Sequence, residues 1–113
     1  MQLIKSLWQR RKRIRPKFDL GQCFVMDTAM DWLSPNDINR ALDRHRHGDW
    51  GEVSMEFGFV NEVALANRGV LFSVYVSEDG HVFEVITQLD RLQTTVQMKA
   101  PWEYALEEEI LYH

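Results

Sequence analysis

The densest group of polar side chains lies at residues 43–50, where histidines and aspartates alternate with arginines. Imidazole and carboxylate groups bind transition metals and transfer protons, so His45-x-His47-x-Asp49 has residue types suited to a metal site or to acid–base chemistry. On a helix, however, positions i and i+2 point about 200° apart, so the two imidazoles cannot share one metal. We therefore expect no metal and no cofactor, and we interpret the basic side chains as groups that offset the negative end of a helix dipole.

Other arrangements typical of enzymes do not occur in this sequence. No serine stands in a nucleophile elbow, no glycine-rich loop follows a predicted strand, and no cysteine and histidine motif recurs. Asp90 with His81 is an imaginable acid–base pair, but such residues occur in most domains of this size. The sequence favours a protein without catalytic activity. A metal-dependent hydrolase built on His45, His47, Asp49 and His81 is kept as an alternative.

The polar group lies at the end of a predicted helix. Ser34 and Pro35 are typical of a helix start, because the serine hydroxyl accepts a backbone N–H bond and proline suits the first helical position. Apolar residues then recur at helical spacing, and Gly48 supplies a left-handed end. This helix would carry His45 on its buried face and place residues 49–51 in a tight turn.

Further elements precede and follow this helix. An extended segment is expected at residues 18–26, a brief helix at 28–33, and another helix from a cap at Ser54 to residues 67–69. The period then changes to two, which predicts three strands, at residues 70–77, 82–88 and 92–98. Pro101 begins a C-terminal helix. The predicted fold class is α+β, with N-terminal helices followed by a three-stranded antiparallel β-meander and a C-terminal helix.

The single cysteine excludes an internal disulfide. Cys23 lies in an apolar stretch, and free cysteines are usually buried, so we expect a buried thiol. The N-terminus lacks the apolar core of a signal peptide, and no run approaches the length of about 18 apolar residues that a membrane span needs. We expect a cytoplasmic protein.

Charge divides the chain into a basic arm at residues 1–17 and a single acidic domain at 18–113. The arm carries seven Lys/Arg and no acid, and the rest carries six Lys/Arg and seventeen Asp/Glu, so +7 and −11 give the net charge of −4. Leu3, Ile4 and Leu7, with Trp8, share one face of a predicted amphipathic helix. That face needs a partner, which is the acidic domain, a second copy, another protein or a membrane surface.

Several short motifs follow one another in a definite order along the domain. His45-x-x-Gly48-Asp49-Trp50-Gly51 is followed by Ser73-Val74-Tyr75, and then by Ile86-Thr87-x-x-Asp90-Arg91-x-x-Thr94-Thr95. We interpret Gly48, Asp49, Trp50, Gly51, Asp90 and Arg91 as structural motif residues. Over residues 18–104 this order resembles a family of small, mostly uncharacterised bacterial proteins found on plasmids, phages and integrated mobile elements. The resemblance implies a mobile genetic element as the setting and no particular activity.

The charge division and this setting lead to two expected functions. The first is a non-enzymatic protein-binding module, an inhibitor of a host nucleic-acid-targeting defence complex of the anti-CRISPR or anti-restriction type. Its carboxylates would imitate phosphates towards a basic groove: Asp27, Asp31, Asp37, Asp43, Glu52, Glu56, Glu62, Glu107, Glu108 and Glu109. The second is a nucleic-acid accessory protein that works through the arm: Trp8, Arg10, Arg11, Lys12, Arg13, Arg15 and Lys17.

Overall fold

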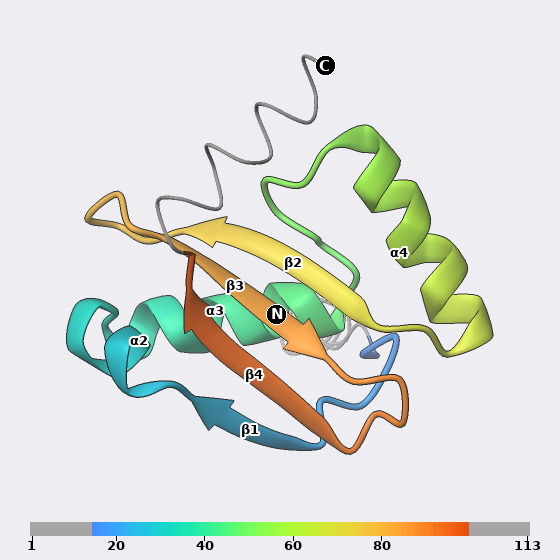
Figure 1. The fold of residues 1–113 in the computed structure, drawn as a ribbon, viewed down its shortest axis with the longest axis horizontal. Helices are drawn as coiled ribbons and strands as arrows, with labels where there is room; N and C mark the ends of the chain where they lie inside the picture. The colour runs from blue at the N-terminus through green and yellow to red at the C-terminus, as the bar shows by residue number, and fades with distance from the viewer. Residues whose placement is uncertain (1–14, 100–113) are drawn as a thin grey trace, which may run out of the picture.

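The computed structural model describes residues 15–99, which form four strands and three helices (Figure 1). In chain order the elements are β1 (Gln22–Val25), α2 (Asp27–Trp32), α3 (Pro35–Arg46), α4 (Met55–Asn67), β2 (Leu71–Val76), β3 (Val82–Thr87) and β4 (Gln93–Met98). The strands form one sheet in the order β1-β4-β3-β2. Strands β2, β3 and β4 pair antiparallel, whereas β1 pairs parallel to β4.

The α+β class is confirmed, and the three predicted strands pair as an antiparallel meander, but the prediction that the sheet has only three strands and is purely antiparallel is wrong. The predicted meander forms part of a four-stranded mixed sheet, and the described part of the chain enters the fold through a strand instead of a helix. Only four residues long, β1 is too short for a period-two pattern. Its parallel partner is β4, where Gln93, paired with Gln22, lies 93 − 22 = 71 positions later in the sequence. No local pattern therefore reveals the pairing. The predicted C-terminal helix lies outside the described residues.

Two predicted helix starts are confirmed. At α3, the Ser34 hydroxyl accepts a bond of 3.1 Å from the Asp37 N–H, and the Asp37 carboxylate accepts one of 3.2 Å from the Ser34 N–H. This reciprocal capping box fixes the first turn of the helix. At α4, the Ser54 hydroxyl accepts a bond of 3.1 Å from the Phe57 N–H. Both helices therefore begin where short-range chemistry dictates.

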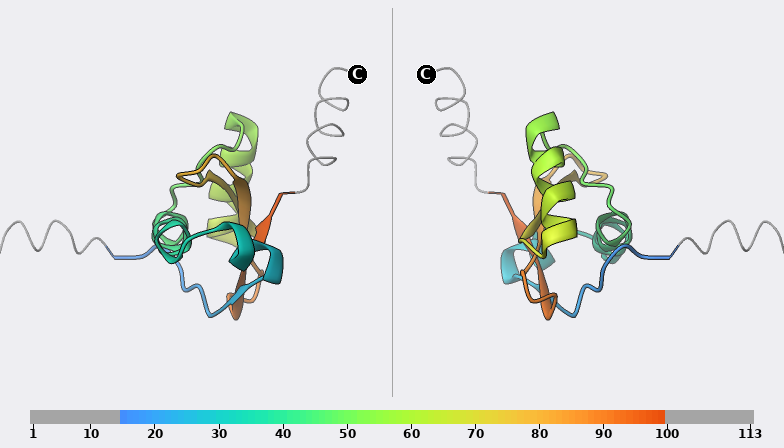
Figure 2. Two further views of the ribbon diagram at one scale, coloured as in Figure 1. Left: turned by 90° about the vertical axis from the view of Figure 1, so that its left-hand side faces the viewer. Right: turned by 90° about the vertical axis from the view of Figure 1, so that its right-hand side faces the viewer.

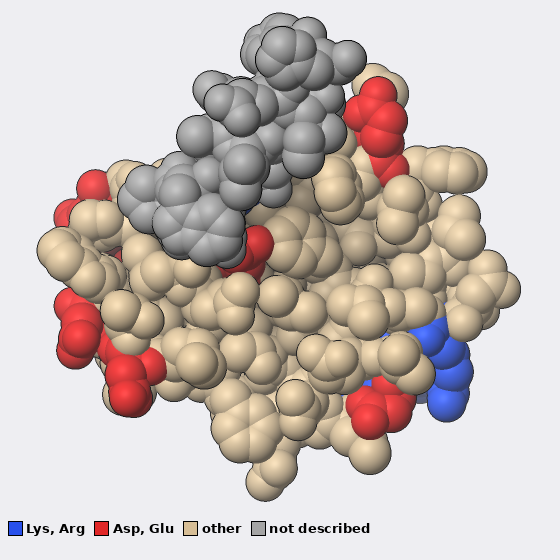
Figure 3. All heavy atoms as spheres, in the orientation of Figure 1, with Lys and Arg blue, Asp and Glu red and all other residues tan. Residues whose placement is uncertain are grey.

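The helices cover the sheet unevenly. Figure 2 shows the sheet edge-on with α3 set off to one side, and Figure 1 shows α4 beside the edge strand β2. The apolar core lies between α2, α3 and the sheet, and consists of Ala29, Leu33, Ala41, Tyr75, Phe83, Val85 and Val96. Phe57 of α4 packs against Phe72 of β2 on the opposite face, with 6.2 Å between ring centroids. On the face turned away from α3, charged side chains are sparse over the described surface (Figure 3).

Candidate functional site

A chain of buried hydrogen bonds ties α3 to the sheet. His45 is completely buried, with Nδ1 at 2.5 Å from Ser73 Oγ and Nε2 at 2.9 Å from Thr87 Oγ1. Thr87 Oγ1 lies 2.7 Å from Thr94 Oγ1, and the Thr94 hydroxyl donates to the Leu20 carbonyl at 2.6 Å. One polar network thus joins α3, β2, β3, β4 and the segment before β1.

The direction of each bond in this network follows from its last acceptor. A carbonyl only accepts, so Thr94 uses its proton on Leu20 and must accept from Thr87. Thr87 then has no proton left for His45, so Nε2–H donates to Thr87 and Nδ1 accepts from Ser73. This assignment requires a neutral imidazole with its proton on Nε2. Burial, with a smaller effect from the Arg91 charge, lowers the pKa of His45 to about 3.

Aromatic rings enclose the imidazole. The ring of Phe18 meets His45 edge-on at 5.2 Å, and the ring of Trp50 does so at 5.7 Å. A serine beside a histidine is the pair that nucleophilic catalysis uses, but Ser73 is as completely buried as His45. A substrate would have to displace core side chains to reach either group. We therefore interpret the pair as a structural tie.

Asp49 belongs to a second, half-exposed cluster. Arg44 donates from Nε to Asp49 Oδ2 at 2.7 Å and from a terminal nitrogen to Oδ1 at 3.1 Å. This hydrogen bonding to Arg44 lowers the pKa of the Asp49 carboxyl. The Tyr75 hydroxyl donates to the Asp49 carbonyl at 2.5 Å, and the Arg44 guanidinium lies 4.7 Å above the Tyr75 ring. The carboxylate and the carbonyl of Asp49 are therefore both hydrogen-bonded, and they stabilise the turn next to Trp50.

The three groups of the His45-x-His47-x-Asp49 pattern lie in separate environments. His47 Nδ1 lies 2.6 Å from the Asp43 carbonyl, whereas His45 is inside and Asp49 is paired with Arg44. Among residues 15–99, no three His, Cys, Asp or Glu side chains are placed to hold a metal ion. Every buried side-chain nitrogen or oxygen in the same range has a hydrogen-bond partner, so none of them waits for a ligand.

The second motif also has a structural role. Asp90 Oδ1 accepts a bond of 2.9 Å from the Leu92 N–H, the turn geometry that the sequence predicts. Arg91 donates to the carbonyls of Gly69 at 2.6 Å, Gln88 at 3.1 Å and Ala64 at 3.1 Å. One guanidinium thus binds the C-terminal end of α4 to the β3–β4 turn.

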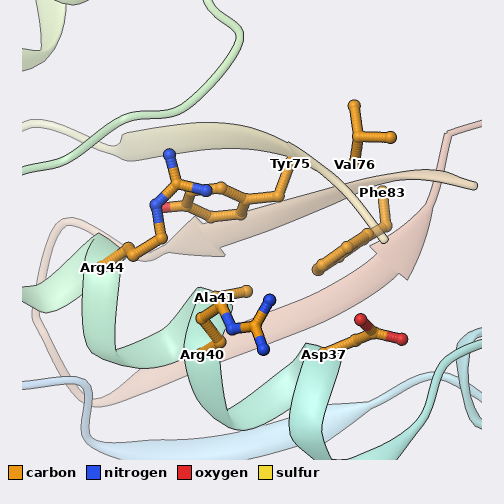
Figure 4. Close-up of a pocket in the computed structure, with 7 residues that line it drawn as sticks. All are labelled: Asp37, Arg40, Ala41, Arg44, Tyr75, Val76 and Phe83. Atoms are coloured by element: carbon orange, nitrogen blue, oxygen red, sulfur yellow. The ribbon is translucent and has the colours of Figure 1, made fainter. Parts of the chain in front are cut away.

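The described surface has a small hollow and a much larger one. Figure 4 shows the smaller, of about 20 Å³, between α3 and the sheet, which has room for about one water molecule. It is lined by Asp37, Arg40, Ala41, Arg44, Tyr75, Val76 and Phe83. The larger, of about 580 Å³, is lined by Pro16, Phe18, Asp19, Leu20, Gly21, Cys23, Arg46, Arg91 and Leu92.

The prediction of a buried thiol is wrong, because Cys23 is exposed at the edge strand β1. Partial burial still raises the pKa of the Cys23 thiol, so the group stays protonated near neutral pH. A protonated thiol is a poor nucleophile, and the larger hollow gains no catalytic group from it.

The acidic residues do not form one continuous surface on the face shown in Figure 3, where the red groups are separated by uncharged atoms. Asp43 pairs with Arg46 at 3.0 Å, and Glu62 accepts from the Trp50 indole N–H at 3.1 Å. Asp27 and Asp31 are exposed on α2. Further exposed carboxylates lie at Glu52 and Glu56, and Asp37 is half-buried in its cap. Glu107, Glu108 and Glu109 lie outside the described residues.

Most of the arm also lies outside the described residues, namely Trp8, Arg10, Arg11, Lys12 and Arg13. Arg15 and Lys17, at its root, are described and exposed. The Lys17 N–H donates to the Arg46 carbonyl at 2.8 Å, which fixes the arm's root to the end of α3.

Sequence reasoning missed an exposed apolar surface on α2. The short helix buries Ala29, followed by Leu33, and turns its remaining large apolar side chains outwards. We call the exposed large apolar residues of this segment the α2 patch: Phe24 of β1, Met26 directly before the helix, and Met30 and Trp32 of α2, with Met30 65% and Trp32 58% exposed. A helix of six residues can bury only one narrow side. The short length of this segment therefore indicates that some of its apolar side chains are exposed.

No helix among the described residues is long and apolar enough to cross a membrane. No protein-family model matches the chain, and comparisons with curated proteins and with solved structures also give no match. The case for a function therefore depends on the chain's own surfaces and charges.

Proposed function

We propose that this protein is a non-enzymatic module that binds another protein through the α2 patch. The observation that carries the proposal is the exposure of four large apolar side chains within residues 24–32, of which Met30 and Trp32 are the most exposed. Methionine and aromatic side chains are enriched in protein interfaces, and flexible thioethers adapt to varied partners. Exposed large apolar side chains that gather in one short segment of a small domain are typical of a docking site.

Carboxylates at the patch define the chemistry of the partner. Asp27 and Asp31 are exposed on the same short helix. Residues 15–99 as a whole carry thirteen Asp/Glu against eight Lys/Arg, a net charge of −5. Such a surface favours a partner whose apolar ridge is bordered by Arg or Lys, because complementary charges speed association and discriminate between partners.

The partner that best fits this chemistry is a host nucleic-acid-targeting defence complex, of the guide-RNA or restriction type. Its phosphate-binding groove carries the required basic side chains, and a bound acidic protein would compete with nucleic acid there. The resemblance to proteins of mobile genetic elements gives such an inhibitor a setting, in the cytoplasm of a bacterial host.

The test uses purified guide-RNA nucleases and restriction complexes as probes. Binding of the full chain is measured at low and high salt, together with Met30→Gln and a control, Leu89→Gln. Leu89 is 59% exposed in the β3–β4 turn, so its substitution removes a similar apolar side chain elsewhere. We expect a salt-sensitive complex that Met30→Gln weakens and Leu89→Gln leaves intact. Failure to bind every probe at low salt, or equal effects of both substitutions, would contradict the proposal.

The position of two arginines supports a second candidate function, nucleic-acid binding through the basic arm. Arg46 and Arg91 line the larger hollow at the arm's root, close to Lys17. Together with the arm they would form a positively charged surface that binds the phosphate backbone of a nucleic acid. A gel-shift titration of the full chain and of a chain that begins at Phe18 tests this function. Absence of any shift with either DNA or RNA at low salt would remove it.

A further inference from the structure

Helix α4 carries large apolar side chains on its exposed positions as well as on the side that meets the sheet. Its inner side contacts β2: Asn61 donates to the Phe72 carbonyl at 2.7 Å and accepts from the Phe72 N–H at 3.0 Å. Helices that are apolar on all sides are normally buried on all sides. Figure 1 shows that the described elements cover α4 only on its β2 side.

The outer side of α4 carries a continuous apolar stripe. Met55, Phe59 and Val63 follow one another at intervals of four residues, so they share one line along the helix. Met55 is 90% exposed and Phe59 is 70% exposed. Two exposed carboxylates, Glu56 and Glu62, border the stripe. The surface therefore fits an amphipathic segment that carries apolar residues on one face and positive charges beside them.

The chain contains a segment of that composition, and its root lies near α4. Lys17 is fixed to α3 through Arg46, and the ring of Phe18 stacks on Trp50 with 6.2 Å between centroids. The Trp50 indole in turn donates to Glu62 of α4 at 3.1 Å. Two aromatic side chains in contact, Phe18 and Trp50, thus link the arm's root to the acidic border of the stripe.

We propose that residues 1–14 dock on the outer side of α4. Leu3, Leu7 and Trp8 would cover the apolar stripe, while the arm's Lys and Arg side chains approach Glu56 and Glu62. The lengths agree, because fourteen residues would extend about 21 Å if they formed a helix on docking, and the thirteen residues of α4 extend about 20 Å. Docking would occupy the same basic residues that contact phosphates in the second candidate function.

A crosslinking experiment on the full chain tests this contact. In a Cys23→Ser background, Ser6→Cys is combined with Val63→Cys, which leaves Met55 and Phe59, the two most exposed side chains of the stripe, and the apolar side chains of the arm in place. The matched control combines Ser6→Cys with Met30→Cys on the α2 patch, another exposed apolar surface. We expect the first pair to form an intramolecular disulfide at least about tenfold faster in dilute protein, because docking raises the effective thiol concentration.

A third variant ties the result to the apolar stripe. Phe59→Ala, added to the first pair, should slow the crosslink towards the rate of the control, and the exposed position of Phe59 means that the fold is retained. Equal rates for both pairs would overturn the proposal. A crosslinked dimer would overturn it and indicate that a second copy docks on α4. Absence of any crosslink would also overturn it and indicate a different partner for α4.

Discussion

Nδ1 of His45 accepts a hydrogen bond from the Ser73 hydroxyl across a distance of 2.5 Å, and neither side chain has contact with solvent. The two residues stand 28 positions apart, on α3 and β2. Because Thr87 and Thr94 extend the bond to the Leu20 carbonyl, a single imidazole links the helix to most of the sheet. This is how a motif with the residue types of an active site instead stabilises the fold.

Ser73→Ala should destabilise the protein by about 1–3 kcal/mol, because it leaves the buried Nδ1 of His45 without its donor. The measurement is the free energy of unfolding from urea titration followed by tryptophan fluorescence. Thr28→Ala, which removes an exposed hydroxyl from α2, is the control and should change stability by less than about 0.5 kcal/mol. Equal losses for both variants would refute the structural role of the network.

The pH dependence of stability should show the neutral state of His45. Burial lowers the pKa of His45 in the folded protein to about 3 from its ordinary 6.5, so the unfolded chain binds the proton more tightly. This contribution to stability is complete above pH 6.5 and declines as the pH falls towards 3, by up to about 1.4 kcal/mol per pH unit. Unfolding free energies of wild type and His45→Asn are compared between pH 7 and pH 5. A parallel decline in both would contradict a depressed pKa.

Arg91→Lys should loosen the junction between α4 and the β3–β4 turn. Lysine cannot reproduce the guanidinium fork that reaches Gly69, Gln88 and Ala64, so backbone carbonyls lose their donor. We expect a loss of about 1–3 kcal/mol and faster amide hydrogen exchange at the C-terminal end of α4. The matched control is Arg68→Lys, an exposed arginine at the end of the same helix, which should exchange like wild type.

Asp49→Asn should cost little by comparison, although the Arg44–Asp49 pair has good geometry. The two side chains are 39% and 53% exposed, and ion pairs in that environment contribute about 0–1 kcal/mol. The Asp49 carbonyl that binds Tyr75 is unaffected by the substitution. Thermal unfolding at low and high salt measures the difference, and a loss as large as that of Ser73→Ala would show that the pair is worth more than its exposure suggests.

Local chemistry predicted much of this fold, and long-range pairing could not be predicted. Ser34 and Ser54 mark helix starts because capping involves residues three positions apart. The pairing of β1 with β4 and the contact of His45 with Thr87 join residues far apart in sequence, so neither leaves a local pattern. The exposure of Cys23 follows from the edge position of β1, because an extended segment was expected at residues 18–26 but its place at the edge of the sheet was not.

The candidate site was harder to predict than the fold. Asp27 and Asp31 were identified by their charge, whereas Met30 and Trp32 were overlooked because large apolar residues are expected in a core. Several large apolar side chains are exposed on α2 and α4, among them Met30, Trp32, Met55 and Phe59. On α2 the exposed side is set by the packing of Ala29 and Leu33 into the core, and the sequence alone does not reveal that packing.

The most direct test of protein binding through the α2 patch is a hydrogen-exchange footprint of the full chain. The chain is measured alone and in complex with the defence complex that binds it most tightly among the purified probes. We expect slower exchange in residues 24–32 on binding, and loss of both the complex and the protection in Met30→Gln. Protection confined to other segments, or a complex that survives Met30→Gln unchanged, would contradict it.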